Sequence, residues 1–155
     1  MASTATKKVD PHQIITVTNG FNGKLVYISP KSGETYVWDQ FGDEQEMELS
    51  ELKSAKSSAK NFFINNWFMF SEEYQWVIDY IGVGQFYKNA LTLDRFDELF
   101  SGSPEKIEEI VSKMSEGQKQ SLAYRARQKV VDGEIDSRRV VAALERSLGV
   151  ELDEK

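Results

Sequence analysis

The densest group of side chains that could act in catalysis or bind a metal ion is a set of four carboxylates within six residues. They belong to Asp43, Glu44, Glu46 and Glu48. Paired carboxylates can perform acid–base catalysis, and several carboxylate oxygens together can bind calcium. The segment lacks the Asp-x-Asp-x-Asp-Gly spacing of a calcium loop. In a β-strand, alternation directs Glu44, Glu46 and Glu48 to one face. We therefore predict a solvated acidic face, for which a partner protein's basic surface is the best functional match.

A second group of charged side chains is basic and lies in the C-terminal third of the chain. Its members are Lys119, Arg125, Arg127, Lys129, Arg138 and Arg139. Arginines on short helices suggest a helix-turn-helix that contacts DNA. Seven acidic residues between Glu105 and Asp136 balance them, however, which favours a face of internal salt bridges. Where these arginines are free, an acidic patch on a protein is as good a partner as DNA, and we take Arg125, Arg127, Arg138 and Arg139 as candidate protein-contact residues.

Aromatic side chains form the third group, because 17 of the 18 lie between Phe21 and Phe100. Four of them on a small curved sheet could stack nucleic-acid bases, namely Tyr27, Tyr36, Trp38 and Phe41. Base stacking also requires a basic groove, whereas the chain before Ser103 carries nine basic and 14 acidic residues. Most of the net charge of −6 therefore belongs to this region. The aromatic residues are predicted to fill a core or a protein interface.

The residue types that most enzymes and metal sites need are scarce. The chain has no cysteine, which excludes disulfides, thiolate zinc sites and a cysteine nucleophile, and a single histidine argues against a Ser-His-Asp triad. That histidine, His12, is expected to have no partner within reach. Gly82-Val83-Gly84 lacks the third glycine of a dinucleotide-binding motif. We predict a protein that is not an enzyme, with no catalytic, cofactor-binding or metal-binding residues and no cofactor.

Strands and helices that would position these groups follow from the apolar pattern. The predicted strands are 14–18, 25–28, 35–38, 44–49 and 67–70, and the Gly-containing turns between the first four favour an antiparallel meander. Ser50 is predicted to cap a helix from Glu51 to Asn61, on which Lys53, Lys56 and Lys60 form one basic stripe. The fold class is therefore α+β, with a small antiparallel barrel-like sheet of about five strands and inserted helices.

Three further helices are predicted after the loop Ser101-Gly102-Ser103-Pro104. Ser103 is the N-cap of the first, Ser115-Glu116-Gly117-Gln118 is a capping box for the second, and Asp136 is the N-cap of the third, which ends at Gly149. The predicted organisation is a flexible leader at 1–12, an aromatic-rich barrel-like domain at 13–100 and a helical unit at 101–155. No apolar run is long enough to span a membrane, and the N-terminus lacks the apolar stretch of a signal peptide.

Several segments resemble small proteins that tailed bacteriophages of low-GC bacteria encode. The residues concerned are Gly33 to Trp38, Phe41 to Met47, Phe62 to Phe68, Ser121 to Arg127 and Gly133 to Arg138. This resemblance implies a virion component or a phage-encoded accessory protein, in the cytoplasm of a host cell or in the virion. It implies no active-site residues.

Taken together, these patterns predict a noncatalytic structural protein that works by protein–protein contact. The acidic and arginine-bearing surfaces are complementary, so copies of the chain could join head to tail. Two alternatives stay open. One is a nucleic-acid-binding or transcription-regulating module that reads DNA with its C-terminal helices, which the acidic balance of the chain does not favour. The other is an inhibitor of a host enzyme, in which the acidic face mimics nucleic acid.

Overall fold

The computed structural model describes residues 9–152 of the chain. β-branched and aromatic residues, bounded by turns that contain glycine or asparagine, favour the first three strands, whereas the fourth is rich in glutamate. The strands are β1 (Ile14–Asn19), β2 (Leu25–Ile28), β3 (Thr35–Trp38), β4 (Glu44–Glu48) and β5 (Phe68–Met69). The α+β class and the five predicted strands are confirmed.

The strands pair differently from the predicted meander. β1 is the central strand of a three-stranded antiparallel sheet with the order β4-β1-β5, and β2 and β3 form a separate hairpin. The prediction that β1 and β2 would pair was wrong. Apart from its first residue the β-branched segment of β1 is largely buried, so it takes a partner on each edge. No closed barrel is seen among the described strands, so the barrel-like part of the prediction is not confirmed.

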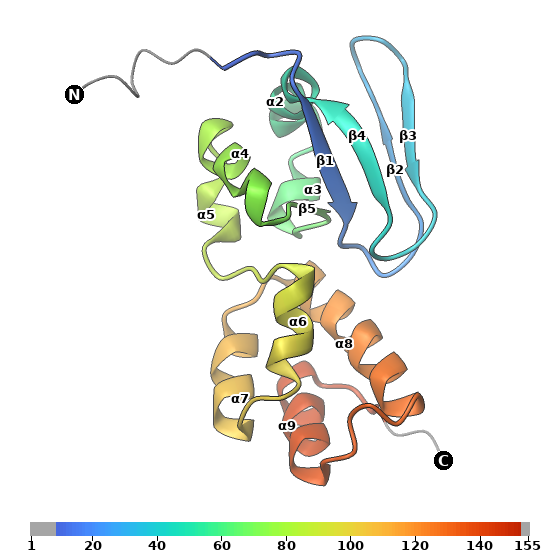
Figure 1. Cartoon of the computed structure of the whole chain (residues 1–155), viewed down its shortest axis with the longest axis vertical. Helices are drawn as coiled ribbons and strands as arrows, with labels where there is room; N and C mark the ends of the chain where they lie inside the picture. Colours follow the sequence, from blue (N-terminus) through green and yellow to red (C-terminus); the bar gives the residue numbers. More distant parts are fainter. Residues whose placement is uncertain (1–8, 153–155) are drawn as a thin grey trace, which may run out of the picture.

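Helices make up the rest of both halves of the molecule (Figure 1). The first half contains α2 (Leu49–Ser58), α3 (Asn61–Ile64), the 3₁₀ helix η1 (Glu72–Tyr74), α4 (Gln75–Tyr80) and α5 (Gly84–Tyr87). The second half contains α6 (Leu93–Leu99), α7 (Pro104–Ser112), α8 (Glu116–Val131) and α9 (Arg138–Leu148). The three helices predicted after residue 101 are therefore present as α7, α8 and α9.

Side-chain caps fix the ends of the C-terminal helices. The backbone N–H groups of Lys106 and Gln118 donate to the hydroxyl oxygens of Ser103 and Ser115, at 3.2 and 3.1 Å, which confirms both predicted N-caps. Gly149 ends α9 in the left-handed conformation, with φ of 70°, as predicted for a C-terminal cap. Each cap satisfies backbone groups that a helix end leaves without a partner.

Three other predicted caps differ in the structure. Asp136 does not cap α9, because the next residue, Ser137, accepts from the N–H of Val140. Ser50 does not cap α2, which begins at Leu49, and its hydroxyl donates to Glu48 instead. Gln118 does not complete a capping box, because its side chain bonds to a distant backbone segment.

Two hydrophobic cores lie above and below the middle of the molecule. The first core packs the two sheets against α2 and α4, with Trp38, Phe63 and Phe68 fully buried. The second core packs α6 against α7, α8 and α9, with Phe96 and Leu122 at its centre. The buried side chains of α6 thus belong to the core of the C-terminal helices, although α6 precedes the predicted boundary between residues 100 and 101. That domain boundary stays a prediction.

Polar groups join the two halves at a contact that we call the interunit seam, formed by Asn65, Asn66, Ser115, Gly117, Gln118 and Ser121. Asn66 is buried and has a positive φ of 56°, the left-handed conformation that asparagine tolerates better than most residues. Its amide nitrogen donates to the carbonyl of Phe86 at 2.8 Å, and the hydroxyl of Ser115 donates to its amide oxygen at 2.7 Å. The turn before β5 is thereby tied to the start of α8.

Close backbone approach completes the interunit seam. The carbonyl of Asn65 lies against the Cα of Gly117, where any side chain would collide with it. The side chain of Gln118 spans to Leu91, accepting from its N–H at 3.0 Å and donating to its carbonyl at 2.7 Å. The hydroxyl of Ser121 donates to the carbonyl of Gly20. One face of α8 is therefore buried by polar contacts to the first half.

We expect Gly117→Ala to destabilise the protein by about 1 to 3 kcal/mol, the usual cost of overpacking. In a solvent-exposed helix the same change stabilises by about 1 kcal/mol. A decrease in the free energy of unfolding therefore reports the close packing at the seam and not helix propensity. Urea unfolding measures it. Gly84→Ala is the matched control, because an added methyl group there makes only ordinary contact. A Gly117→Ala variant as stable as the wild type would contradict the described packing.

Candidate interaction surfaces

The acidic strand face consists of Glu44, Glu46 and Glu48 on β4. These side chains are exposed, and in the register of the sheet they lie opposite Thr18, Thr16 and Ile14 of β1. Met47, between Glu46 and Glu48 in sequence, is buried as the alternation predicts, whereas Gln45, between Glu44 and Glu46, is exposed. Neither Glu44 nor Glu46 forms an ion pair within residues 9–152. The outer side of the sheet therefore carries a row of carboxylates open to a cationic partner.

His12 contacts one end of this face. Its Nδ1 lies 3.0 Å from the Oε1 of Glu48, so the expectation that His12 has no partner was wrong. The hydrogen bond and the charge of Glu48 raise the pKa of His12, and the same hydrogen bond lowers the pKa of Glu48. Sequence separation hid this contact, which forms because the N–H of Ser50 donates to the carbonyl of Pro11 and draws the N-terminal segment across β4.

The four candidate arginines do not form one surface. Arg125 pairs with Asp97 of α6 at 3.3 Å, and Lys129 of the same helix contacts both Asp97 and Glu134. Arg127 donates to the backbone carbonyl of Glu151 at 3.1 Å. The predicted face of internal salt bridges is thus present on α8. These cations hold α8 to neighbouring segments.

The remaining two arginines form the arginine end, defined as Arg138 and Arg139 in the first turn of α9. Both are exposed, and neither makes an ion pair with any described carboxylate. Cations in a first helical turn are disfavoured by the helix dipole, so an external anion would stabilise them. β4 lies in the upper part of the molecule and α9 at its lower end, so the acidic strand face and the arginine end are far apart along the long axis (Figure 1).

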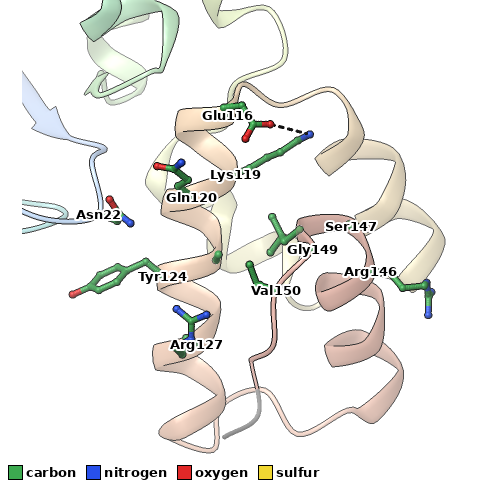
Figure 2. Close-up of a pocket in the computed structure, with 12 residues that line it drawn as sticks. Asn22, Glu116, Lys119, Gln120, Tyr124, Arg127, Arg146, Ser147, Gly149 and Val150 are labelled. Atoms are coloured by element: carbon green, nitrogen blue, oxygen red, sulfur yellow. Dashed lines mark ion pairs between the residues drawn. The ribbon is translucent and has the colours of Figure 1, made fainter.

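A groove of about 390 Å³ runs between α8 and the segment that follows α9 (Figure 2). Three cations line it, Lys119, Arg127 and Arg146. Lys119 lies 3.8 Å from Glu116, and Arg146 points away from Arg127 and pairs with Glu108 of α7 at 2.5 Å. Since each cation already contacts an acceptor within the molecule, the groove offers little unmatched charge to a ligand.

Sequence reasoning missed a buried carboxylate, Glu51 of α2. The hydroxyls of Tyr27 and Ser29 donate to its two oxygens at 2.9 and 3.0 Å. Burial and the Glu51 carboxylate raise the pKa of Tyr27 to about 12, so the phenol stays protonated and acts as a donor. All three residues are at most 7% exposed, so the cluster holds the β2–β3 hairpin against α2 away from solvent. A glutamate in the first turn of a helix is ordinary in sequence, so only the fold reveals this cluster.

The aromatic side chains considered for base stacking are mostly buried or partly buried. Tyr27 and Trp38 are buried in the first core, and Tyr36 packs partly buried against it. Phe41 is half-buried and stacks on Phe96 of the second core, with ring centroids 6.2 Å apart. The indole N–H of Trp38 donates to the carbonyl of Val17 at 2.9 Å. These rings therefore join the sheets and the two cores.

Within residues 9–152, no three His, Asp or Glu side chains lie close enough together to hold a metal ion. None of the described helices is long and apolar enough to cross a bilayer. No protein-family model, curated protein or solved structure matches this chain.

We expect Glu48→Gln to lower the pKa of His12 towards its ordinary value of about 6.5. Because the folded-state pKa is raised, the contact stabilises the fold at low pH and loses its effect as the pH rises through that pKa. An NMR titration measures this, since His12 is the single histidine. Glu46→Gln is the control and leaves the pKa almost unchanged. An equal pKa in Glu48→Gln and wild type would refute the contact.

Truncation at the buried cluster tests the role of Glu51. Glu51→Ala leaves two buried hydroxyls without an acceptor, and we expect a loss of about 1 to 3 kcal/mol in unfolding free energy. Glu51→Gln keeps one acceptor oxygen and loses less. Exposed Glu72→Ala, measured in the same urea titrations, should change stability by less than about 0.5 kcal/mol. Equal effects at positions 51 and 72 would show that the cluster does not hold the hairpin.

Proposed function

We propose that the protein is a noncatalytic structural protein that assembles with copies of itself, within a bacteriophage particle or complex. The observation that carries the proposal is the separation of two exposed surfaces of opposite charge, in which Glu44, Glu46, Arg138 and Arg139 form no ion pair with any described residue. The acidic strand face lies on β4 in the upper half of the molecule, and the arginine end lies on α9 at the lower end (Figure 1). The resemblance of several segments to phage-encoded proteins supplies the setting.

Head-to-tail contact follows from this arrangement. A surface that is not its own complement cannot form a two-fold interface, but it can bind the opposite surface of the next copy. Repetition of that contact gives a ring or a filament, depending on the rotation between copies. Complementary charge orients the partners and speeds their encounter more than it adds affinity.

A nucleic-acid-binding function is the second candidate, favoured by the exposure of Arg138 and Arg139 at the start of α9. DNA-reading helices contact bases with their N-terminal residues, which is where these arginines lie. Two observations weigh against it. Asp136 lies two residues before Arg138, where its carboxylate would repel phosphates. The N-terminal part of α8 is buried in the interunit seam at Gln118, so it is not free to contact DNA. Retention of the full-length protein on DNA at low salt would favour this candidate.

Charge reversal tests the head-to-tail contact. We expect Glu44→Lys/Glu46→Lys/Glu48→Lys and Arg138→Glu/Arg139→Glu each to abolish association when studied alone, because each then has two ends of like charge. Mixing the two variants should restore association, since each end again meets its opposite. Multi-angle light scattering at low ionic strength measures the mass, and high salt should dissociate the mixture.

Glu105→Lys/Glu109→Lys on α7 is the control for a change of net charge, because both residues are exposed and lie outside the two surfaces. It should associate as the wild type does. The proposal fails if the charge-reversed variants associate as the wild type does, or if their mixture contains only monomers.

A further inference from the structure

Two large aromatic side chains are exposed side by side on α4. Trp76 and Tyr80 are 37% and 41% exposed, and their rings contact edge to face with centroids 6.1 Å apart. Tryptophan and tyrosine are the residues most enriched among those that dominate binding energy at protein interfaces. Neither ring is needed to fill the first core, which is completed on this helix by Val77 and Ile78. Their exposure therefore points to a binding role.

Lysines surround Tyr80. The ammonium of Lys53, on α2, lies 5.8 Å from the centre of the Tyr80 ring, within the range of a cation–π contact. Lys31, in the turn after β2, lines the same site. Neither lysine forms an ion pair with any carboxylate in the described part of the chain. The site is therefore both aromatic and positively charged, and neither ammonium group is held in an internal ion pair.

A groove of about 310 Å³ lies between these groups and is lined by Pro11, Lys31, Leu49, Lys53 and Tyr80. Its volume is at the lower end of the range for ligand-binding pockets, about 300 to 1,000 Å³. Apolar wall residues and two ammonium groups at one site match a peptide that carries both apolar and acidic side chains. The nearby carboxylate of Glu48 is already bonded to His12 and Ser50.

We propose that this lysine–tyrosine groove binds an acidic segment of a partner polypeptide. Carboxylates of the segment pair with Lys31 and Lys53, and an apolar side chain packs on Leu49 and Tyr80. The acidic strand face and the arginine end take no part, so this interaction can fail or succeed independently of head-to-tail assembly.

Single-stranded nucleic acid fits the groove less well than an acidic polypeptide does. A nucleic acid carries a charge at every residue and requires a continuous basic track. Here Glu72 and Glu73 precede Trp76 by one helical turn, so the basic character ends at Tyr80. The carboxylates of a polypeptide can be spaced to match two ammonium groups. Binding of an oligonucleotide, compared with binding of an acidic peptide, distinguishes these two occupants.

The test measures the binding of a fluorescein-labelled peptide of alternating glutamate and leucine to the full-length protein by fluorescence polarisation at low ionic strength. We expect saturable binding, with Kd raised about tenfold or more by Lys53→Glu and by Tyr80→Ala, a change of about 1.4 kcal/mol. Lys53→Gln, which removes the charge without reversing it, should give a smaller loss. Circular dichroism confirms that each variant is folded, which is expected because both side chains are exposed.

Lys106→Glu on α7 is the matched control, because it makes the same change of net charge at an exposed lysine in the other half of the molecule. It should alter Kd less than Lys53→Glu does. A peptide with lysine in place of glutamate should not bind. Three results would each overturn the proposal: no saturable binding of the acidic peptide, equal losses in Lys53→Glu and Lys106→Glu, or tighter binding of an oligothymidylate of equal charge.

Discussion

The interunit seam is the contact on which the rest of the architecture depends. α8 approaches the turn at Asn65 and Asn66 so closely that only glycine fits at position 117. Asn66, in a left-handed conformation, bonds to both halves of the molecule through its side chain. Because these groups are buried and directional, they fix one orientation of the halves where apolar packing alone would allow several. The distance between the two charged surfaces follows from that orientation.

Some of the charge in this protein is used within the molecule. Arg125 and Lys129 hold α6 and α8 together, and Arg146 holds α9 to α7. The acidic strand face and the arginine end gather charges that these internal pairs leave at the surface. Exposed charge pairs contribute little free energy each and weaken with salt, so the acidic strand face and the arginine end give orientation and specificity. Stronger binding requires buried apolar area, which the exposed ring of Tyr80 can supply.

Sequence reasoning succeeded where the determining interactions are local. The burial of Met47 between exposed glutamates, the hydroxyl caps at Ser103 and Ser115 and the left-handed Gly149 depend on residues within a few positions of each other, and all are present. It failed where the structure depends on contacts between segments that are distant in the sequence. The pairing of β1 with β4, the contact of His12 with Glu48 and the acceptance of two hydroxyls by Glu51 join residues more than 20 positions apart. No periodicity in the sequence encodes these contacts.

Head-to-tail assembly requires the two opposite charged surfaces, held apart by the interunit seam, to join copies of the chain. The solution mass of the wild-type protein, measured by light scattering as concentration and ionic strength are varied, tests this proposal. We expect a mass above that of the monomer that grows with concentration at low salt and returns to the monomer as salt screens the charges. A monomer mass at every concentration and every salt would contradict it.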